Sequence, residues 1–252
     1  MTTDKVDLLR VAQFDDRPAM GKVAADAVTA KIRELLSQQE TVNMIFAAAP
    51  SQNEFLEALV GQAGIEWERI NAFHMDEYIG LPKDAPQRFG QFLNERLFAN
   101  VPFRSVNYLD GNAANIQEEC LRYTDLLAHH PTDIVCMGIG ENCHIAFNDP
   151  HVADFNDDAK VKVVDLDLAC RQQQVNDGCF AELEAVPTHA LTLTIPALMA
   201  APFIFCMVPG SNKAAAVRHT LNAEISPQYP STILRTHPDA TLFIDRESAN
   251  LL

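Results

Sequence analysis

The chain has 252 residues, of which 48% are hydrophobic and 21% charged, and its formal net charge is −15 at pH 7. Such a composition is typical of a globular protein, and the length suits one large α/β domain. The negative charge disfavours binding to nucleic acid or to an anionic membrane, and no apolar run is long enough to span a bilayer. Any anionic substrate would need a locally positive site.

The six cysteines are scattered and include no C-x-x-C pair. This spacing predicts neither a disulfide framework nor a structural zinc site. Residues 1–10 lack the apolar segment of a signal peptide. Together these features indicate a cytoplasmic protein in a reducing compartment.

Segments with helical and strand-like patterns alternate along the chain. The helix-period segments cover residues 18–38, 51–59, 88–98, 116–129 and 212–221. Short apolar runs that predict buried strands cover 42–49, 70–75, 133–139, 161–164, 191–195, 203–208 and 241–244. Apolar strands separated by helices are typical of a parallel sheet covered on both faces. The sequence therefore predicts an α/β fold: a three-layer α/β/α domain with a mostly parallel, Rossmann-like sheet.

No linker, repeat or low-complexity tract interrupts the chain, so residues 1–252 are predicted to form one domain. The polar segment 154–178 lies between two predicted strands and is a candidate for a mobile lid. The sequence does not determine an oligomeric state, and a homo-oligomer is compatible with it.

Polar clusters follow four of the predicted strands, at the edge where ligands bind in open α/β sheets. The clusters are Ala49–Gln52, His74–Tyr78, Gly138–Pro150 and Pro209–Lys213. If the strands are parallel, all four clusters lie at one edge of the sheet. This convergence is the main functional signal in the sequence.

The cluster Gly138–Pro150 combines a glycine-bounded turn with several polar side chains. Gly140 allows a sharp turn and a close approach to a ligand, and His144 can transfer protons near neutral pH. Asp149 follows His144 by five residues and could orient it. The G-x-G is not a dinucleotide-binding fingerprint, because no third glycine follows at the required spacing. The structural alternative is a loop with a surface histidine.

Each of the other two titratable clusters also has a structural alternative. In the second cluster, Asp76 and Glu77 should face opposite ways on an extended chain, so only one enters the site easily. Asp76 could instead be a helix N-cap. In the fourth cluster, Ser211 and Lys213 at a helix start could bind an anion, or Lys213 could simply be solvated.

Taken in order, these motifs resemble the glucosamine-6-phosphate deaminase/isomerase family and, more distantly, the 6-phosphogluconolactonases. The resemblance covers about residues 15–246. It rests on F-H-M-D-E-Y-I-G-L-P at 73–82, on H-I-A-F-N-D-P at 144–150, on V-P-T-H-A-L-T at 186–192 and on G-S-N-K-A at 210–214.

The resemblance implies a substrate, a reaction and residue roles. The substrate would be a small amino-sugar phosphate, glucosamine 6-phosphate or galactosamine 6-phosphate, converted with water to a ketose phosphate and ammonia. Asp76 would move a proton between C2 and C1, and His144 would assist ring opening. Lys213 would hold the phosphate, and Arg171 is a second candidate for this role. No metal or organic cofactor is implied.

The sequence departs from the family pattern in three places. Asn142 and Cys143 stand where the family usually has aspartate and glycine, and a carboxamide cannot accept a proton at neutral pH. Glu141 is a candidate to supply the missing carboxylate. Asp149 is one methylene shorter than the usual glutamate, which keeps a charge partner for the histidine but changes its reach.

The third departure affects phosphate binding. Ala48, Ala49 and Pro50 replace a threonine and glycines whose N–H groups would cradle phosphate, and Pro50 has no N–H. Phosphate binding would then depend on Lys213, Ser211 and Ser51.

Two other functions remain open. A 6-phosphogluconolactonase-like hydrolase usually has a different element after its histidine, so Ile145–Pro150 favours the deaminase. A sugar-phosphate-binding protein that has lost catalysis would explain Asn142 and the altered first loop, but it would not need Asp76, His144 and Asp149.

Overall fold

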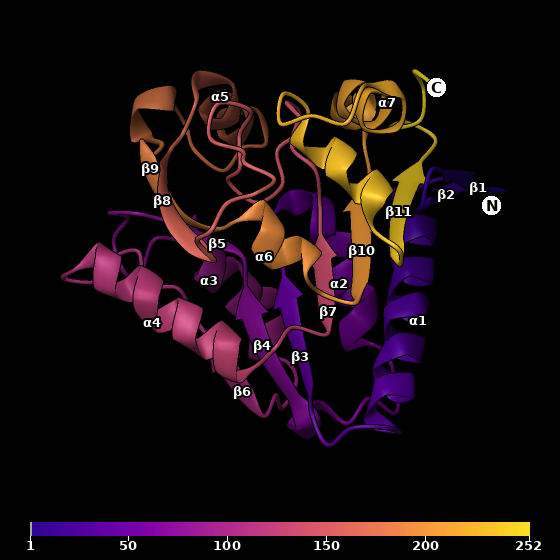
Figure 1. Cartoon of the computed structure of the whole chain (residues 1–252), viewed down its shortest axis with the longest axis horizontal. Coiled ribbons are helices and arrows are strands. Elements are labelled where there is room, and N and C mark those ends of the chain that lie inside the picture. Colours follow the sequence, from indigo (N-terminus) through magenta and orange to yellow (C-terminus); the bar gives the residue numbers. More distant parts are fainter. Residues whose placement is uncertain (1) are drawn as a thin grey trace.

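Eight strands form one sheet in the computed structural model, which describes residues 2–252 (Figure 1). They are β1 (Thr2–Val6), β2 (Leu9–Phe14), β3 (Val42–Phe46), β4 (Ile70–His74), β6 (Ser105–Asn107), β7 (Ile134–Met137), β10 (Phe203–Val208) and β11 (Ala240–Asp245). The order across the sheet is β1-β2-β11-β10-β7-β3-β4-β6. Every neighbouring pair is parallel except β1 with β2, which confirms the predicted mostly parallel sheet.

A second, antiparallel sheet lies beside the first. Its strands are β5 (Asp76–Tyr78), β8 (Val161–Asp165) and β9 (His189–Leu193), in the order β5-β9-β8. The sequence predicts β8 and β9 as strands but does not indicate that they leave the main sheet. It also does not predict β1, β2, β5 or β6: β5 and β6 have three residues each, β1 is mostly exposed, and the polar residues Arg10 and Gln13 interrupt β2.

The helices are α1 (Arg17–Leu36), α2 (Asn53–Val60), α3 (Phe89–Leu93), α4 (Ile116–His129), α5 (Leu168–Asn176), α6 (Ile195–Met199) and α7 (Ala214–Asn222). Most of them cover the two faces of the main sheet, whereas Cys170 of α5 packs in a cluster with Val164 and Ala190 of the second sheet. Short 3₁₀ turns are η1 (Pro50–Gln52), η2 (Trp67–Arg69), η4 (Leu183–Ala185), η5 (Ser211–Lys213) and η6 (Pro230–Thr236), and the π-helical turn η3 (Asn94–Phe98) continues α3. No helix of the described chain is both long and apolar enough to cross a membrane.

Strand alternation divides the core between the two faces of the sheet. Met44 and Phe46 of β3 pack in a cluster with residues of α1 and α2, whereas Ile45 packs in a cluster with residues of α4 and α7. Successive side chains of a strand point to opposite faces, so each central strand contributes to both clusters. The result is the predicted arrangement of three layers.

The order of the strands reverses between β3 and β7. From β3 the sheet extends through β4 to β6, and from β7 it extends through β10 to β11. A reversal of strand order creates a crevice beyond the carboxyl ends of the strands, where open α/β sheets bind ligands. The loops after β3, β4, β7 and β10, which carry the four polar clusters, therefore meet at one edge.

Close packing of α1 on α2 supports one side of this edge, and Gly21 permits it. A β-carbon at Gly21 would lie 2.7 Å from the backbone carbonyl carbon of Glu54 and 2.9 Å from the backbone nitrogen of Phe55. We expect Gly21→Ala to lower the free energy of unfolding by about 1–3 kcal/mol, measured by urea denaturation, because the helices must separate.

The matched control is Gly61→Ala, at the end of α2. A methyl group there would meet only ordinary contacts of 3.5 Å or more, and the φ of −74° suits alanine. This variant should be as stable as the parent or more stable by up to about 1 kcal/mol. Equal stability of the two variants would contradict the packing argument.

Candidate active site

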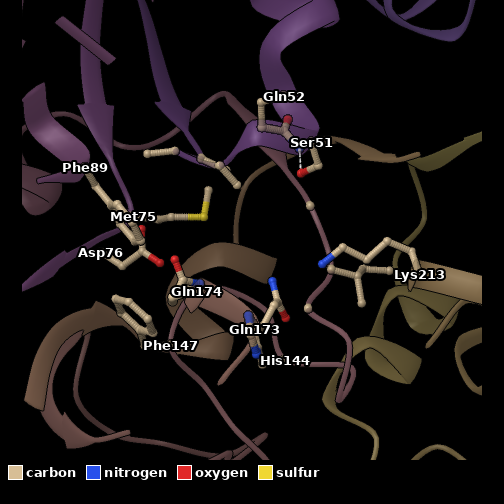
Figure 2. A pocket seen from close by; sticks show the side chains of 17 residues that line it. Ser51, Gln52, Met75, Asp76, Phe89, His144, Phe147, Gln173, Gln174 and Lys213 are labelled. Carbon is tan, nitrogen blue, oxygen red and sulfur yellow. Dashed lines mark hydrogen bonds between the residues drawn. The ribbon is translucent and has the colours of Figure 1, made fainter. Parts of the chain in front are cut away.

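A pocket opens at the carboxyl edge of the main sheet (Figure 2). The loops after β3, β4, β7 and β10 line it, together with residues of α3 and α5. Asp76, His144 and Lys213 are the titratable side chains of this lining in the described chain. The three groups predicted to meet therefore do share one pocket.

Asp76 presents a buried carboxylate to the pocket. The residue is 7% exposed, and no described residue donates a hydrogen bond to its side chain. Burial, and secondly the charge of Glu77, hold the pKa of Asp76 well above its ordinary value. A carboxylate that water and protein donors stabilise so little is a stronger base than an exposed aspartate.

The histidine of the same cluster holds the backbone of Asp76 in place. His74 is fully buried, and its Nε2 accepts a hydrogen bond from the Leu109 N–H at 2.9 Å. Its Nδ1 therefore carries the proton and donates to the Asp76 carbonyl oxygen, also at 2.9 Å. Burial lowers the pKa of His74 to about 4, although the bond to Asp76 opposes this shift. His74 is thus neutral and structural.

Glu77 points away from the pocket, as the alternation along an extended chain predicts. Its carboxylate accepts hydrogen bonds from the backbone N–H groups of Tyr78, Phe89 and Gly90, at 2.9–3.0 Å. Burial still leaves its pKa raised. Because Phe89 and Gly90 begin α3, Glu77 fixes this helix, and Phe89 lines the pocket.

His144 pairs with the fully buried Asp149. Nδ1 of His144 lies 3.0 Å from Oδ1 of Asp149, although the contact is not aligned as a hydrogen bond. Burial alone would raise the pKa of Asp149, but interactions with His144, with the Asn142 amide and with the backbone of Asp167 outweigh it, and the pKa is lowered. Asp149 is therefore ionised at neutral pH, and its carboxylate faces the Nδ1 side of the His144 ring.

Gly140 makes room for the imidazole of His144. A β-carbon at Gly140 would lie 2.1 Å from Cε1 of the ring. Glycine is therefore required at this position by the lack of space beside the ring. Its backbone conformation does not require glycine, since its φ is not in the left-handed region.

Lys213 lies across the pocket from Asp76 in Figure 2. The residue is 4% exposed, and no described carboxylate lies within 4.0 Å of its ammonium group. Burial lowers its pKa, and the charges of Asp177 and Glu141 partly offset this effect. A buried ammonium group without an anionic partner is suited to binding an anionic ligand.

The loop after β3, in which Pro50 has no backbone N–H to donate, forms a turn that side-chain contacts hold in place. Ser51 lines the pocket beside Gln52, whose Nε2 donates to the Met207 carbonyl at 3.1 Å and contacts Oγ of Ser51 at 3.2 Å. Arg17 donates to the Pro50 carbonyl at 3.0 Å and pairs with Glu54. These contacts fix the turn, and Ser51 and Lys213 both line the pocket.

Comparison with known proteins agrees with this geometry. The family of glucosamine-6-phosphate isomerases and 6-phosphogluconolactonase matches residues 15–243. A glucosamine-6-phosphate deaminase of Streptococcus sanguinis is 31% identical over 244 residues, 97% of this chain and 99% of the relative. One of Bacillus cereus is 37% identical over 187 residues, 74% of this chain and 70% of the relative.

The chain belongs to this glucosamine-6-phosphate isomerase/6-phosphogluconolactonase family. Among solved structures, a monomeric glucosamine-6-phosphate deaminase superposes with a TM-score of 0.87 at 29% identity, covering 96% of this chain and 99% of that one. The 6-phosphogluconolactonase of Thermotoga maritima, at 21% identity and a TM-score of 0.76 over 94% of this chain and 99% of that one, shares the fold.

Within the family pattern, Asn142 links two carboxylates. Its Nδ2 donates to Oδ1 of Asp149 at 2.9 Å and lies 3.4 Å from Oδ2 of Asp167, while its Oδ1 accepts the His144 N–H at 3.1 Å. An aspartate at position 142 would place three carboxylates together. A carboxamide, which donates as well as accepts, suits this position better than the usual acid.

Glu141 does not replace the missing acid in this structure. Its Oε1 accepts a hydrogen bond from Asn212 at 2.9 Å, and it does not line the pocket. This placement does not support that role for Glu141: among the described residues, the carboxylate that pairs with His144 is that of Asp149. Cys143, at the usual glycine position, adopts a φ of 70°, in the left-handed region that favours glycine.

Two further predicted phosphate-binding residues lie outside the pocket. Nη2 of Arg171 donates to the carbonyl oxygens of Leu183 and Val186, at 2.7 and 3.0 Å. Ser211 is exposed and does not line the pocket. Because Arg171 is bound to backbone carbonyls and Ser211 faces solvent, the structure supports neither as a phosphate ligand.

Conversely, Gln173 and Gln174 of α5 line the pocket, and the sequence does not predict them. They stand in a polar segment with weak helical periodicity, and glutamine carries no charge or motif that signals chemistry. Only the tertiary placement of α5 reveals them.

Donor atoms that could hold a metal lie close together only around Asp149 in the described residues, with either His144 and Cys170 or His151 and Asp167. Asp149 is already engaged by His144 and Asn142, and neither it nor Cys170 lines the pocket. These contacts fit an acid that orients His144 better than a metal centre.

The raised pKa of Asp76 predicts a pH-dependent cost in stability. In the unfolded chain Asp76 ionises above its ordinary pKa of 3.8, whereas in the folded chain it keeps its proton to a higher pH. The free energy of unfolding therefore falls as the pH rises from the unfolded-state pKa to the folded-state pKa. Asp76→Asn should therefore be more stable than the parent at pH 8, by about 1 kcal/mol or more, with the difference shrinking toward pH 4.

Denaturant titrations at pH 4, 6 and 8 would measure this difference. Glu77→Gln is the neighbouring control: an amide cannot accept all three backbone N–H groups, so this variant should lose stability. A loss of stability in Asp76→Asn at every pH would contradict the argument.

Proposed function

We propose that this protein is a glucosamine-6-phosphate deaminase, converting glucosamine 6-phosphate and water to fructose 6-phosphate and ammonia. The observation that carries the proposal is the pocket that contains the unpartnered Asp76 carboxylate, the Asp149-paired His144 and the unpaired Lys213. The curated relatives with this name, at 31–37% identity, support the substrate and the reaction.

Binding would begin with the phosphate. Lys213 supplies the positive charge, Ser51 a hydroxyl, and the ammonium group is buried enough to strengthen the attraction. The sugar then extends toward Asp76. His144, with Nδ1 turned to Asp149, presents Nε2 to the ligand and protonates the ring oxygen as the C1–O bond breaks.

Asp76 would act on the open chain. Its carboxylate removes the proton from C2, the electron pair forms a C1=C2 double bond, and the former carbonyl oxygen on C1 takes up a proton from solvent, which gives an enolamine. Return of the proton to C1 produces a C2 imine; addition of water and loss of ammonia then leave the ketose. The substrate's amino and carbonyl groups stabilise the charge, so the residues of this chain need only move protons.

Kinetics on the parent and Asp76→Asn test this proposal. Ammonia release from glucosamine 6-phosphate should fall by about 10²–10⁴-fold in the variant, since a carboxamide cannot take the proton. In the parent, kcat/KM should rise with pH as Asp76 ionises, with its acid limb above the range of an ordinary aspartate.

Galactosamine 6-phosphate and 6-phosphogluconolactone should be run in parallel. Faster turnover of galactosamine 6-phosphate would mean that this sugar phosphate is the preferred substrate. Hydrolysis of the lactone without ammonia release would indicate that the protein is a 6-phosphogluconolactonase. Binding of glucosamine 6-phosphate without any turnover would indicate a sugar-phosphate-binding protein.

A second comparison tests the roles of Asn142 and Glu141. Because Asn142 holds both Asp149 and the His144 backbone, Asn142→Ala should lower kcat by about tenfold or more, whereas Glu141→Gln should change it less than about twofold. A larger effect of Glu141→Gln would restore Glu141 as the missing acid.

Three broader predictions remain proposals. The polar segment 154–178 contains β8 and α5, and α5 supplies two pocket residues, which is compatible with a lid. Residues 1–252 would act as one domain in the cytoplasm. Assembly into a homo-oligomer is also a proposal, and the similar deaminase of known structure, which is monomeric, offers the alternative.

A further inference from the structure

Gln174 is a buried carboxamide that faces the pocket without a protein partner. It is 8% exposed and lines the pocket, and no described residue forms a hydrogen bond with its side chain. In Figure 2 its amide points into the same space as the Asp76 carboxylate, on the side of the pocket away from Lys213.

Other glutamines in or near the pocket have hydrogen-bond partners in the protein, which Gln174 lacks. Gln173 also lines the pocket, but its Oε1 accepts the Glu141 N–H at 2.9 Å. Gln172 is exposed and bonds to Asn176 at 3.1 Å. In the first loop, Gln52 is bonded to the Met207 carbonyl. Of the four, only Gln174 has an amide free to meet a ligand.

The surroundings of Gln174 are otherwise apolar on this side of the pocket. Met75, Phe89, Ala146 and Phe147 complete the lining there, and the rings of Phe89 and Phe147 stack at 5.4 Å. An apolar wall with one uncommitted amide is the usual construction of a specificity site, in which the polar group orients the ligand. An amide both donates and accepts, which matches a sugar hydroxyl.

We propose that Gln174 binds the sugar hydroxyls next to the carbons on which Asp76 acts, and is therefore a specificity-determining residue. The inference rests on the proposed function for the identity of the ligand. With Lys213 at the phosphate, Gln174 would recognise the opposite end of the molecule. Its contribution is to affinity for the sugar and not to affinity for phosphate.

Gln174→Met tests this role because methionine keeps the length of the side chain and removes its hydrogen bonds. We expect kcat/KM for glucosamine 6-phosphate to fall about tenfold or more, mainly through KM, because the contact forms in the ground state. The inhibition constant of inorganic phosphate should stay within about twofold of the parent. Lys213→Met should instead weaken phosphate inhibition strongly.

Gln172→Ala, on the exposed face of the same helix, is the matched control and should leave both quantities unchanged. Thermal melts establish that each variant is folded. A kcat/KM within about twofold of the parent in Gln174→Met would overturn the inference. Equal weakening of sugar-phosphate and inorganic-phosphate binding would also overturn it, because it would mean that α5 has moved.

Calorimetric binding separates this inference from the proposed function. If the parent releases no ammonia, the proposed function fails. About tenfold weaker binding of glucosamine 6-phosphate to Gln174→Met, with unchanged binding of inorganic phosphate, would still support the role of Gln174. A parent that binds no glucosamine 6-phosphate would overturn both.

Discussion

The burial of one carboxylate without a hydrogen-bond donor is the constraint on which the site depends. Asp76 begins β5, where pairing with β9 and the bond from His74 hold its backbone, and where no described side chain neutralises its charge. A neutral His74 is essential to this arrangement, because a protonated imidazole two residues away would lower the pKa of Asp76. Glu77 meanwhile uses its own charge to fix α3, which holds Phe89 at the pocket.

The rest of the pocket complements this base. In the proposed function, the buried ammonium group of Lys213 would attract an anion into a protein whose net charge is −15, so its local charge would have to override the repulsive field of the whole molecule. His144 is held by Asp149, and Asn142 separates Asp149 from Asp167. The environments of the ionisable groups therefore differ, and each suits its group to act as base, as acid or as anion ligand.

Much of this can be predicted from the sequence because apolar strands and strand-end polar clusters report directly on a parallel sheet. The helix 116–129 has the bounds that its periodicity predicts, and the convergence of Asp76, His144 and Lys213 follows from topology. The orientation of side chains cannot be predicted in this way. Glu141 turns to Asn212, Arg171 to backbone carbonyls, and Gln174 into the pocket, because tertiary contacts select each rotamer. The second sheet cannot be predicted from the sequence, because β8 and β9 have the same apolar pattern as the strands of the main sheet. Only the tertiary pairing of β5 with β9 separates them from it.

Transfer of an isotope label tests the central claim most directly. Glucosamine 6-phosphate with deuterium at C2 would be converted in ordinary water, and the fructose 6-phosphate analysed for label at C1. A single carboxylate on a residue that is only 7% exposed should return a measurable share of the deuterium to C1 before solvent replaces it. Complete replacement by solvent hydrogen would contradict a shielded Asp76 as the base that moves this proton.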